Sequence, residues 1–153
     1  MSVRVGMGYD AHRFEAGRRL VLGGVEIPHE RGLAGHSDAD VLVHAVIDAI
    51  LGAAGDGDLG TLFPADEEQW RDANSLDLLT VALGRVPGRV LNVDATLICE
   101  EPRIGPHRPE MERNIAEPLS APVSVKATTS EGMGWIGRGE GIACVAVALL
   151  DRE

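Results

Sequence analysis

The stretch SDADVLVHAVIDAILGAAG (37–55) carries the strongest secondary-structure signal in the chain. Ser37 is a favoured helix N-cap, and Asp38 and Asp40 follow where the helix dipole favours negative charge. Apolar residues recur with the spacing of one helix face, at positions 42, 45, 46, 49 and 50, and a glycine follows at the end. The sequence therefore predicts an amphipathic helix here, whose apolar face must pack against a second layer of structure.

Strand-like and helical segments lie on both sides of this helix. We expect strands at 3–9, 18–28 (broken by Gly23-Gly24), 89–100, 122–129 and 141–150, further helices at 74–86 and 108–120, and loops at 29–37 and 55–73. Strands flanking the second and third helices imply βαβ crossovers. We therefore expect one domain over residues 1–153, of the α+β class, with a single mixed sheet and helices packed on one face.

Composition limits the possible partners. The 153 residues carry a formal net charge of −10, which disfavours nucleic acid and anionic membranes. The longest apolar run, IACVAVALL (142–150), is far too short to span a bilayer, and the N-terminus lacks a basic region followed by an apolar stretch. We expect a cytoplasmic protein, and an acidic chain of this kind can hold phosphates only if cations mediate.

Asp10 and His12, in GYDAHRF (8–14), are candidates for a metal site. They are two residues apart at the end of a strand, so their side chains point to the same face. A surface pair produces the same pattern. His44 lies in the middle of the predicted helix, where a lone histidine is often only a packed residue. If strand and helix pack together, however, two imidazoles and one carboxylate converge, which is the ligand set of a catalytic zinc with an open fourth position.

Other polar groups could complete such a site. Asp40 and Asp48 lie four residues on either side of His44 and could orient its ring. His36 and Ser37 come at the predicted helix N-terminus, where backbone N–H groups favour an anion such as phosphate. The stretches GDGDLG (55–60), KATTSEG (126–132) and GWIGRGEGI (134–142) add carboxylates, hydroxyls and Arg138, although caps, turns and solvated loops explain each of them equally well.

These motifs resemble those of one family, the 2-C-methyl-D-erythritol 2,4-cyclodiphosphate synthases of the non-mevalonate isoprenoid pathway. The resemblance runs in order from about residue 3 to residue 150 and includes D-x-H-x-F, H-S-D-x-D-x-x-x-H and K-A-T-T-x-E. It implies a homotrimer with ferredoxin-like βαβ units and active sites between subunits. It also implies zinc on Asp10, His12 and His44, and a second divalent cation, Mg or Mn, near Glu131 beside the substrate phosphates.

The resemblance further implies an intramolecular phosphoryl transfer. 4-Diphosphocytidyl-2-C-methyl-D-erythritol 2-phosphate would become 2-C-methyl-D-erythritol 2,4-cyclodiphosphate and CMP, with His36 and Thr129 stabilising the transition state. The implied substrate-binding residues are Ser37, Asp58, Gly60, Phe63, Asp66, Cys99, Pro102, Arg103, Ile104, Gly105, Thr128, Trp135 and Arg138. Asp58 and Gly60 would hold the methylerythritol portion, and Cys99 through Gly105 with both threonines the cytidine nucleotide. At this length we expect no fused nucleotidyltransferase domain.

The chain departs from the family pattern at two points, and two other functions stay open. Family members commonly have Asp-x-Asp after Phe-Pro, whereas this chain has Ala65, Asp66 and Glu67; Val145 replaces an acidic residue. The first alternative is a zinc hydrolase with His36 or Asp58 as base. The second is a binding module with a structural metal, although structural zinc sites usually have four protein ligands.

Overall fold

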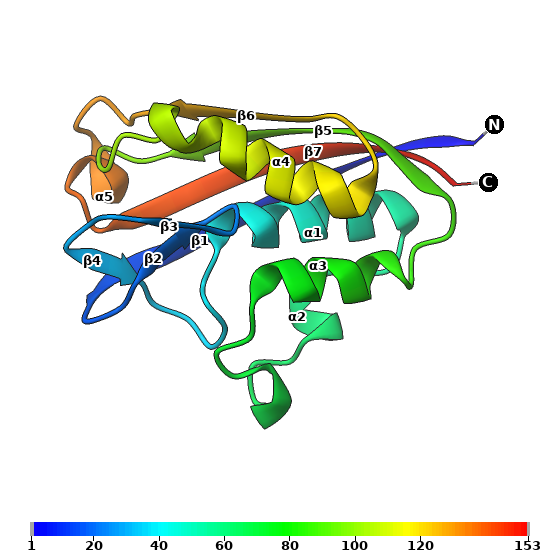
Figure 1. Cartoon of the computed structure of the whole chain (residues 1–153), viewed down its shortest axis with the longest axis horizontal. Coiled ribbons are helices and arrows are strands. Elements are labelled where there is room, and N and C mark those ends of the chain that lie inside the picture. Colours follow the sequence, from blue (N-terminus) through cyan, green and yellow to red (C-terminus); the bar gives the residue numbers. More distant parts are fainter. Residues whose placement is uncertain (1, 153) are drawn as a thin grey trace.

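A five-stranded mixed sheet forms the centre of the fold (Figure 1). The computed structural model describes residues 2–152. The strands, in the spatial order β4-β1-β7-β5-β6, are β4 (Arg31–Leu33), β1 (Val3–Ala16), β7 (Gly141–Asp151), β5 (Arg89–Ile98) and β6 (Val123–Thr128). All neighbours are antiparallel except β5 and β6, which run parallel. This arrangement confirms the α+β class and the mixed sheet.

A hairpin of β2 (Leu20–Leu22) and β3 (Val25–Ile27) forms a second, two-stranded sheet. The expectation of one sheet was therefore incomplete, as was that of a loop over 29–37, where β4 lies. The strand predicted at 18–28 folds back at Gly23 and Gly24, whose φ angles of 59° and 73° suit glycine. The Asp40 carboxylate accepts the N–H of both glycines, at 2.9 and 2.8 Å.

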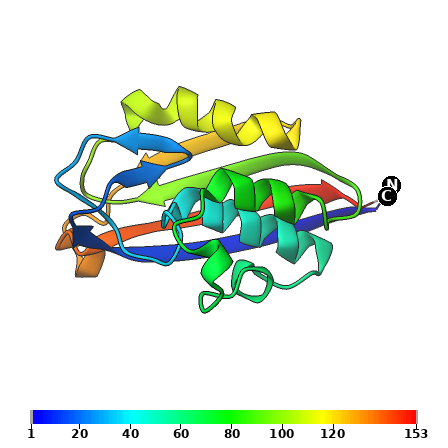
Figure 2. The same ribbon diagram turned by 60° about the horizontal axis from the view of Figure 1, so that its bottom comes forward.

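Three longer helices cover one face of the large sheet (Figures 1 and 2). They are α1 (Val41–Ala54), α3 (Ser75–Leu83) and α4 (Arg108–Leu119); the shorter elements are α2 (Leu59–Leu62), α5 (Gly134–Gly137) and the 3-10 turns η1 (Glu68–Trp70) and η2 (Gly105–His107). Within residues 2–152, no helix has the length and apolar character needed to cross a membrane. The three longer helices were thus predicted in the right places, but α1 begins at Val41 because Asp40, not Ser37, is its N-cap. The expected loop over 55–73 contains α2 and η1, and α5 was not predicted.

The two expected crossovers had different outcomes. α4 joins the parallel, paired strands β5 and β6, as expected of a βαβ unit. α3 leads into β5, but β5 does not pair with the strands that precede the helix, because β7 lies between β5 and β1. The last strand of the chain therefore completes the centre of the sheet, which local pattern alone did not predict.

Two glycines bring α1 unusually close to β1. A Cβ atom on Gly8 would lie 2.0 Å from the carbonyl oxygen of Ala45, and one on Gly6 would lie 2.0 Å from that of Ala49. Only a residue without a side chain permits this approach. The helix backbone consequently rests directly on the strand, and the first turn of α1, which carries His44, lies beside the part of β1 that follows Gly8.

Candidate metal centre

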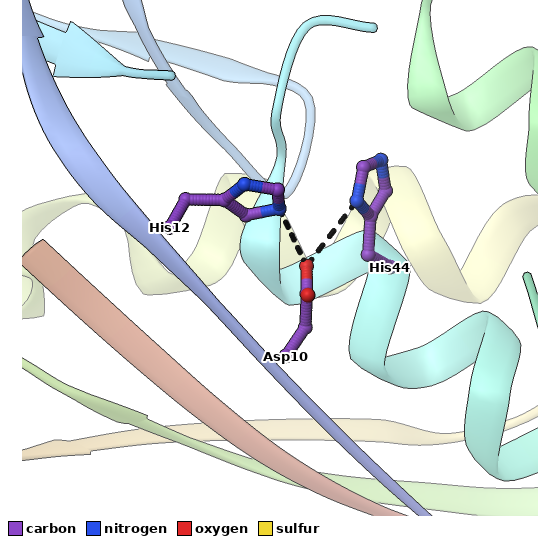
Figure 3. Close-up of side chains that lie close together, drawn as sticks. All are labelled: Asp10, His12 and His44. Atoms are coloured by element: carbon purple, nitrogen blue, oxygen red, sulfur yellow. Dashed lines mark hydrogen bonds and ion pairs between the residues drawn. The ribbon is translucent and has the colours of Figure 1, made fainter. Parts of the chain in front are cut away.

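Asp10, His12 and His44 converge where β1 passes α1 (Figure 3). The Oδ2 atom of Asp10 lies 2.7 Å from His12 Nε2 and 3.2 Å from His44 Nδ1. The two rings meet edge to face, with centroids 5.4 Å apart. Among the residues described, these three offer ligand atoms within 4.8 Å of one another. The structure thus brings together the three residues that the sequence predicted as metal ligands.

Hydrogen bonds behind each ring determine which nitrogen faces Asp10. His12 Nδ1 lies 2.8 Å from the carbonyl oxygen of Ala34, which can only accept, so Nδ1 carries a proton and Nε2 faces the carboxylate. His44 Nε2 lies 3.1 Å from Ser37 Oγ and 2.9 Å from Ser75 Oγ, which leaves Nδ1 for Asp10. Two ring nitrogens and a carboxylate directed at one point suit a metal cation or a proton.

The surroundings of Asp10 favour the ionised form of its carboxyl group. Burial raises the pKa of Asp10, but hydrogen bonds and charge from His12 and His44 outweigh it and bring the pKa to about 2. Burial lowers the pKa of His12, but its hydrogen bond to Asp10 and the Asp10 charge raise it above 6.5 overall. A divalent cation at this point would likewise place positive charge beside the Asp10 carboxylate.

The carboxylates of Asp40 and Asp48 were wrongly assigned as partners of His44. Asp40 is fully buried and accepts N–H groups from the β2–β3 turn and from Val43. Burial and the charge of Asp38 nevertheless raise its pKa to about 6. Asp48 accepts the N–H of Leu59, at 2.6 Å. Both residues anchor neighbouring backbone, and Asp40 accepts the N–H of Val43 in the first turn of α1. The phosphate contact expected of His36 and Ser37 stays a prediction.

A cavity of about 170 Å³ opens beside the three ligand-type residues. Its lining includes His36, Ser37, Phe63, Ala65 and Trp70. Phe63 and Trp70 form one wall through an edge-to-face contact with centroids 4.8 Å apart, and His36 Nε2 lies 3.1 Å from the carbonyl oxygen of Glu67. Asp66 is exposed and does not line this cavity, whereas Ala65 does.

A second cavity of about 170 Å³ collects most of the residues that were assigned to the nucleotide. It is lined by Cys99, Glu100, Pro102, Arg103, Ile104, Gly105, Ala127, Thr128 and Thr129. The Glu100 carboxylate accepts the N–H groups of Ser130 and Gly132, at 2.7 and 3.1 Å, and thereby fixes the loop that carries Glu131. This cavity and the one beside Asp10 share no lining residue.

The remaining predicted residues lie outside these two cavities. Asp58 caps α2 by accepting from Thr61, and Gly60 lies within that short helix. Trp135 lines a wider cavity of about 530 Å³ together with His12 and Arg31. Arg138 forms an ion pair with Glu140, at 2.6 Å. One chain therefore does not gather all the predicted residues at one point.

Two residues near the site were missed from the sequence. Ser75 lies within the helix predicted at 74–86, and its hydroxyl is fully buried against His44; Asn74, directly before it, is the cap. Arg18 donates to the carbonyl oxygens of Gly35 and Ser37, both at 2.8 Å, and so holds the segment around His36. Two adjacent capping-type residues, Asn74 and Ser75, were the available signal for the first. The second carried no local signal.

The fold and site define an α+β protein with a two-histidine, one-carboxylate metal-type centre between a strand and a helix. The family model of the YgbB family matches residues 3–151. The 2-C-methyl-D-erythritol 2,4-cyclodiphosphate synthase of Syntrophomonas wolfei is 56% identical over 156 residues, which cover 98% of this chain and 99% of that protein. The synthase of Alkalilimnicola ehrlichii is 57% identical over 158 residues, covering 99% and 96%.

Solved structures agree with these relatives. A 2C-methyl-D-erythritol-2,4-cyclodiphosphate synthase in a CDP-bound form matches with a TM-score of 0.85 and 35% identity, over 97% of this chain and 100% of that one. The bifunctional IspDF of Campylobacter jejuni matches with a TM-score of 0.93 and 39% identity; this chain covers 43% of that longer protein. The chain belongs to the YgbB family, whose relatives here are 2-C-methyl-D-erythritol 2,4-cyclodiphosphate synthases.

Proposed function

We propose that this protein converts 4-diphosphocytidyl-2-C-methyl-D-erythritol 2-phosphate to 2-C-methyl-D-erythritol 2,4-cyclodiphosphate and CMP. The observation that carries the proposal is the convergence of Asp10, His12 and His44 in a chain that aligns along almost its whole length with synthases of that name. A related structure in a CDP-bound form supports a cytidine diphosphate substrate.

The reaction requires no protein nucleophile. An oxygen of the 2-phosphate forms a bond to the β-phosphorus of the diphosphate, the bond from that phosphorus to the oxygen shared with the α-phosphate breaks, and CMP departs with that oxygen. The protein must therefore align two phosphates and offset their repulsion. Orientation alone contributes up to about 7–11 kcal/mol in favourable intramolecular reactions.

We assign the three converging side chains to zinc. His12 Nε2, His44 Nδ1 and the Asp10 carboxylate would hold it, and a cation there supplies Lewis-acid charge neutralisation to the substrate phosphates. Three protein ligands suit a catalytic site better than a structural one, which usually has four. A second divalent cation, Mg or Mn, is assigned near Glu131. Its carboxylate is the acidic group in the loop that Glu100 fixes.

The roles of the remaining side chains follow their positions. His36 and Ser37, beside the three ligand-type residues, are assigned to the transferring phosphate. The residues of the second cavity are assigned to the cytidine nucleotide, with Thr129 as the group that reaches the phosphates. Asp58 and Gly60, near the end of the first cavity at Leu59, would hold the methylerythritol portion. Phe63 is assigned to the wall of the metal cavity, and Asp66, Trp135 and Arg138 to its approaches.

We further propose a homotrimer in which neighbouring chains share each active site. Because the metal cavity and the nucleotide cavity share no lining residue, a substrate that needs both is served best by two chains. The sheet face opposite the helices exposes the apolar side chains of Val3, Val5, Met7, Tyr9 and Val147, and such a patch typically marks a protein interface. The β5–α4–β6 crossover is assigned as a ferredoxin-like unit. Light scattering should give three times the mass of one chain.

The single-domain organisation and the cytoplasmic location stay predictions of the sequence. One contiguous hydrophobic core and a family match over residues 3–151 support the first.

Phosphorus NMR tests the proposed reaction against the two alternatives. The purified protein is incubated with the cytidine diphosphate substrate and magnesium, with and without a chelator. A cyclic diphosphate and CMP, both abolished by chelation, are the expected products. Inorganic phosphate would identify a hydrolase instead, and unchanged substrate in the presence of verified bound zinc would identify a binding module.

A further inference from the structure

A second layer of polar side chains lies behind His44, on the side away from Asp10. Ser75, the first residue of α3, places its hydroxyl 2.9 Å from His44 Nε2. The same hydroxyl forms a short hydrogen bond to Oδ1 of Asp38. Both Ser75 and His44 are buried, at 0% and 5% exposure, so solvent does not compete for these groups.

The orientation of Asp38 fixes the direction of this chain of hydrogen bonds. Its Oδ1 also accepts the N–H of Asp40, at 3.1 Å, and its Oδ2 accepts the N–H of Ser75, at 2.9 Å. A carboxylate only accepts, so the single hydroxyl proton of Ser75 is directed to Asp38. The Ser75 oxygen then presents a lone pair to His44, and Nε2 must be the nitrogen that carries the proton.

We propose that Asp38 and Ser75 are a positioning pair for the metal centre: together they fix His44 as the Nε2–H tautomer and direct its Nδ1 lone pair at the cation. The inference rests on the proposed metal site. It adds that Ser75 in α3 and Asp38 in the segment before α1 determine how the His44 ring presents Nδ1 to the metal. Ser37 Oγ, 3.1 Å from the same nitrogen, does not impose a direction because its hydroxyl can donate or accept. Outer partners of ligating histidines typically contribute 10–100-fold to metal affinity.

Ser75→Ala tests the pair, with Thr80→Ala as the matched control. Thr80 lies on the same helix and is exposed, and its hydroxyl donates to the carbonyl oxygen of Leu76. The tautomer is read in ¹⁵N-histidine-labelled, metal-free protein that carries Asp10→Ala, because the Asp10 carboxylate 3.2 Å from Nδ1 would otherwise hold a proton there. At alkaline pH this parent and its Thr80→Ala variant should show the Nε2–H tautomer for His44. Ser75→Ala should show a substantial fraction of the Nδ1–H tautomer. Chelator competition should give a zinc dissociation constant raised by about 10–100-fold for Ser75→Ala only.

A folded Ser75→Ala protein with the wild-type tautomer and wild-type zinc affinity would overturn the inference. If Ser75→Ala does not fold, Asp38→Ala decides, because it keeps the Ser75 hydroxyl but removes the acceptor of its proton. It should shift the tautomer in the same direction, and an unchanged tautomer overturns the pair. Because the tautomer is read in metal-free protein, failure of the wild type to bind zinc refutes the proposed metal site separately.

Discussion

Nδ1 of His44 lies 3.2 Å from Oδ2 of Asp10, although one residue comes from helix α1 and the other from strand β1. Backbone packing makes this distance possible. The absence of side chains at Gly6 and Gly8 allows α1 to lie against the strand, so that a ring from the helix reaches a carboxylate on the strand. The candidate metal centre therefore depends on two glycines that have no chemistry of their own.

Gly8→Ala should disrupt the site from a distance. Its Cβ would meet backbone atoms of Ala45 and Ala49 at 2.0 and 2.7 Å, so helix and strand must separate. We expect a loss of about 1–3 kcal/mol or more in the free energy of unfolding, as for overpacked cores, together with weaker zinc binding. Gly52→Ala on α1 is the control. Its Cβ would have a nearest contact of 3.8 Å, and it should gain about 0.5–1 kcal/mol from helix propensity. Equal unfolding midpoints for the two variants would contradict this account.

His44→Ala should lose zinc and turnover together, because two ligands remain where three converge. Zinc content by elemental analysis and product formation are measured on the same preparation, with circular dichroism as the check of folding. His29→Ala should retain its zinc, since His29 contacts Phe14 and is not among the converging ligands. Wild-type turnover in a zinc-free His44→Ala protein would refute the assignment.

The metal-free protein should show opposite pH effects from Asp10 and His12. The lowered pKa of Asp10, about 2 against an ordinary 3.8, stabilises the fold above pH 3.8, and this stabilisation disappears as the pH falls towards 2. The raised pKa of His12 contributes fully below pH 6.5 and is lost as the pH rises through the raised value. These two groups therefore stabilise the fold most between about pH 4 and 6.5.

Urea unfolding of chelated wild type and Asp10→Asn across pH 2.5–9 measures this effect. The wild-type minus variant difference should be largest between about pH 4 and 6.5 and should shrink at both ends, by about 2 kcal/mol on the acid side. The difference largely removes the contribution of Asp40, whose raised pKa of about 6 acts with the opposite sign between pH 3.8 and 6. A difference independent of pH would show that Asp10 and His12 are not coupled as described.

Arg18→Gln should lower turnover without loss of zinc. Its two hydrogen bonds fix the carbonyl groups on either side of His36, and hydrogen bonds from a charged donor contribute about 1.5–3 kcal/mol. If the loss of these hydrogen bonds raises the activation free energy by about 1.4 kcal/mol, turnover falls about tenfold. Arg19→Gln makes the same change of charge one residue away. Its ion pair with Glu26 is exposed, and it should leave turnover almost unchanged. Similar losses in both variants would point to a general charge effect.

The parts of the site that the sequence predicted are those with a local pattern. Asp10 and His12 alternate in phase on a strand, and His44 lies on a helix with clear start and stop signals; both patterns survive in the fold. Their meeting was a hypothesis until the packing of α1 on β1 supplied the contact. The fold class and the β5–α4–β6 crossover were predictable as well, because each of their strands and helices has a local sequence pattern.

Other features depend on long-range contacts and could not be predicted this way. Asp40 and Asp48 share a helix face with His44, but N–H groups from the β2–β3 turn and from α2 bind their carboxylates first. Ser75 reaches His44 only because α3 packs beside α1. β7, the last strand of the chain, lies between β1 and β5. The sequence pattern around α3 does not predict this position.

Restoration of activity by zinc tests whether Asp10, His12 and His44 form a catalytic metal centre. Protein stripped by a chelator is titrated with zinc in the presence of magnesium, and CMP formation is followed at each addition. We predict negligible turnover at the start, a linear rise that ends at one zinc per chain, and no rise for His44→Ala. Full turnover of the stripped protein before any zinc is added would contradict the account.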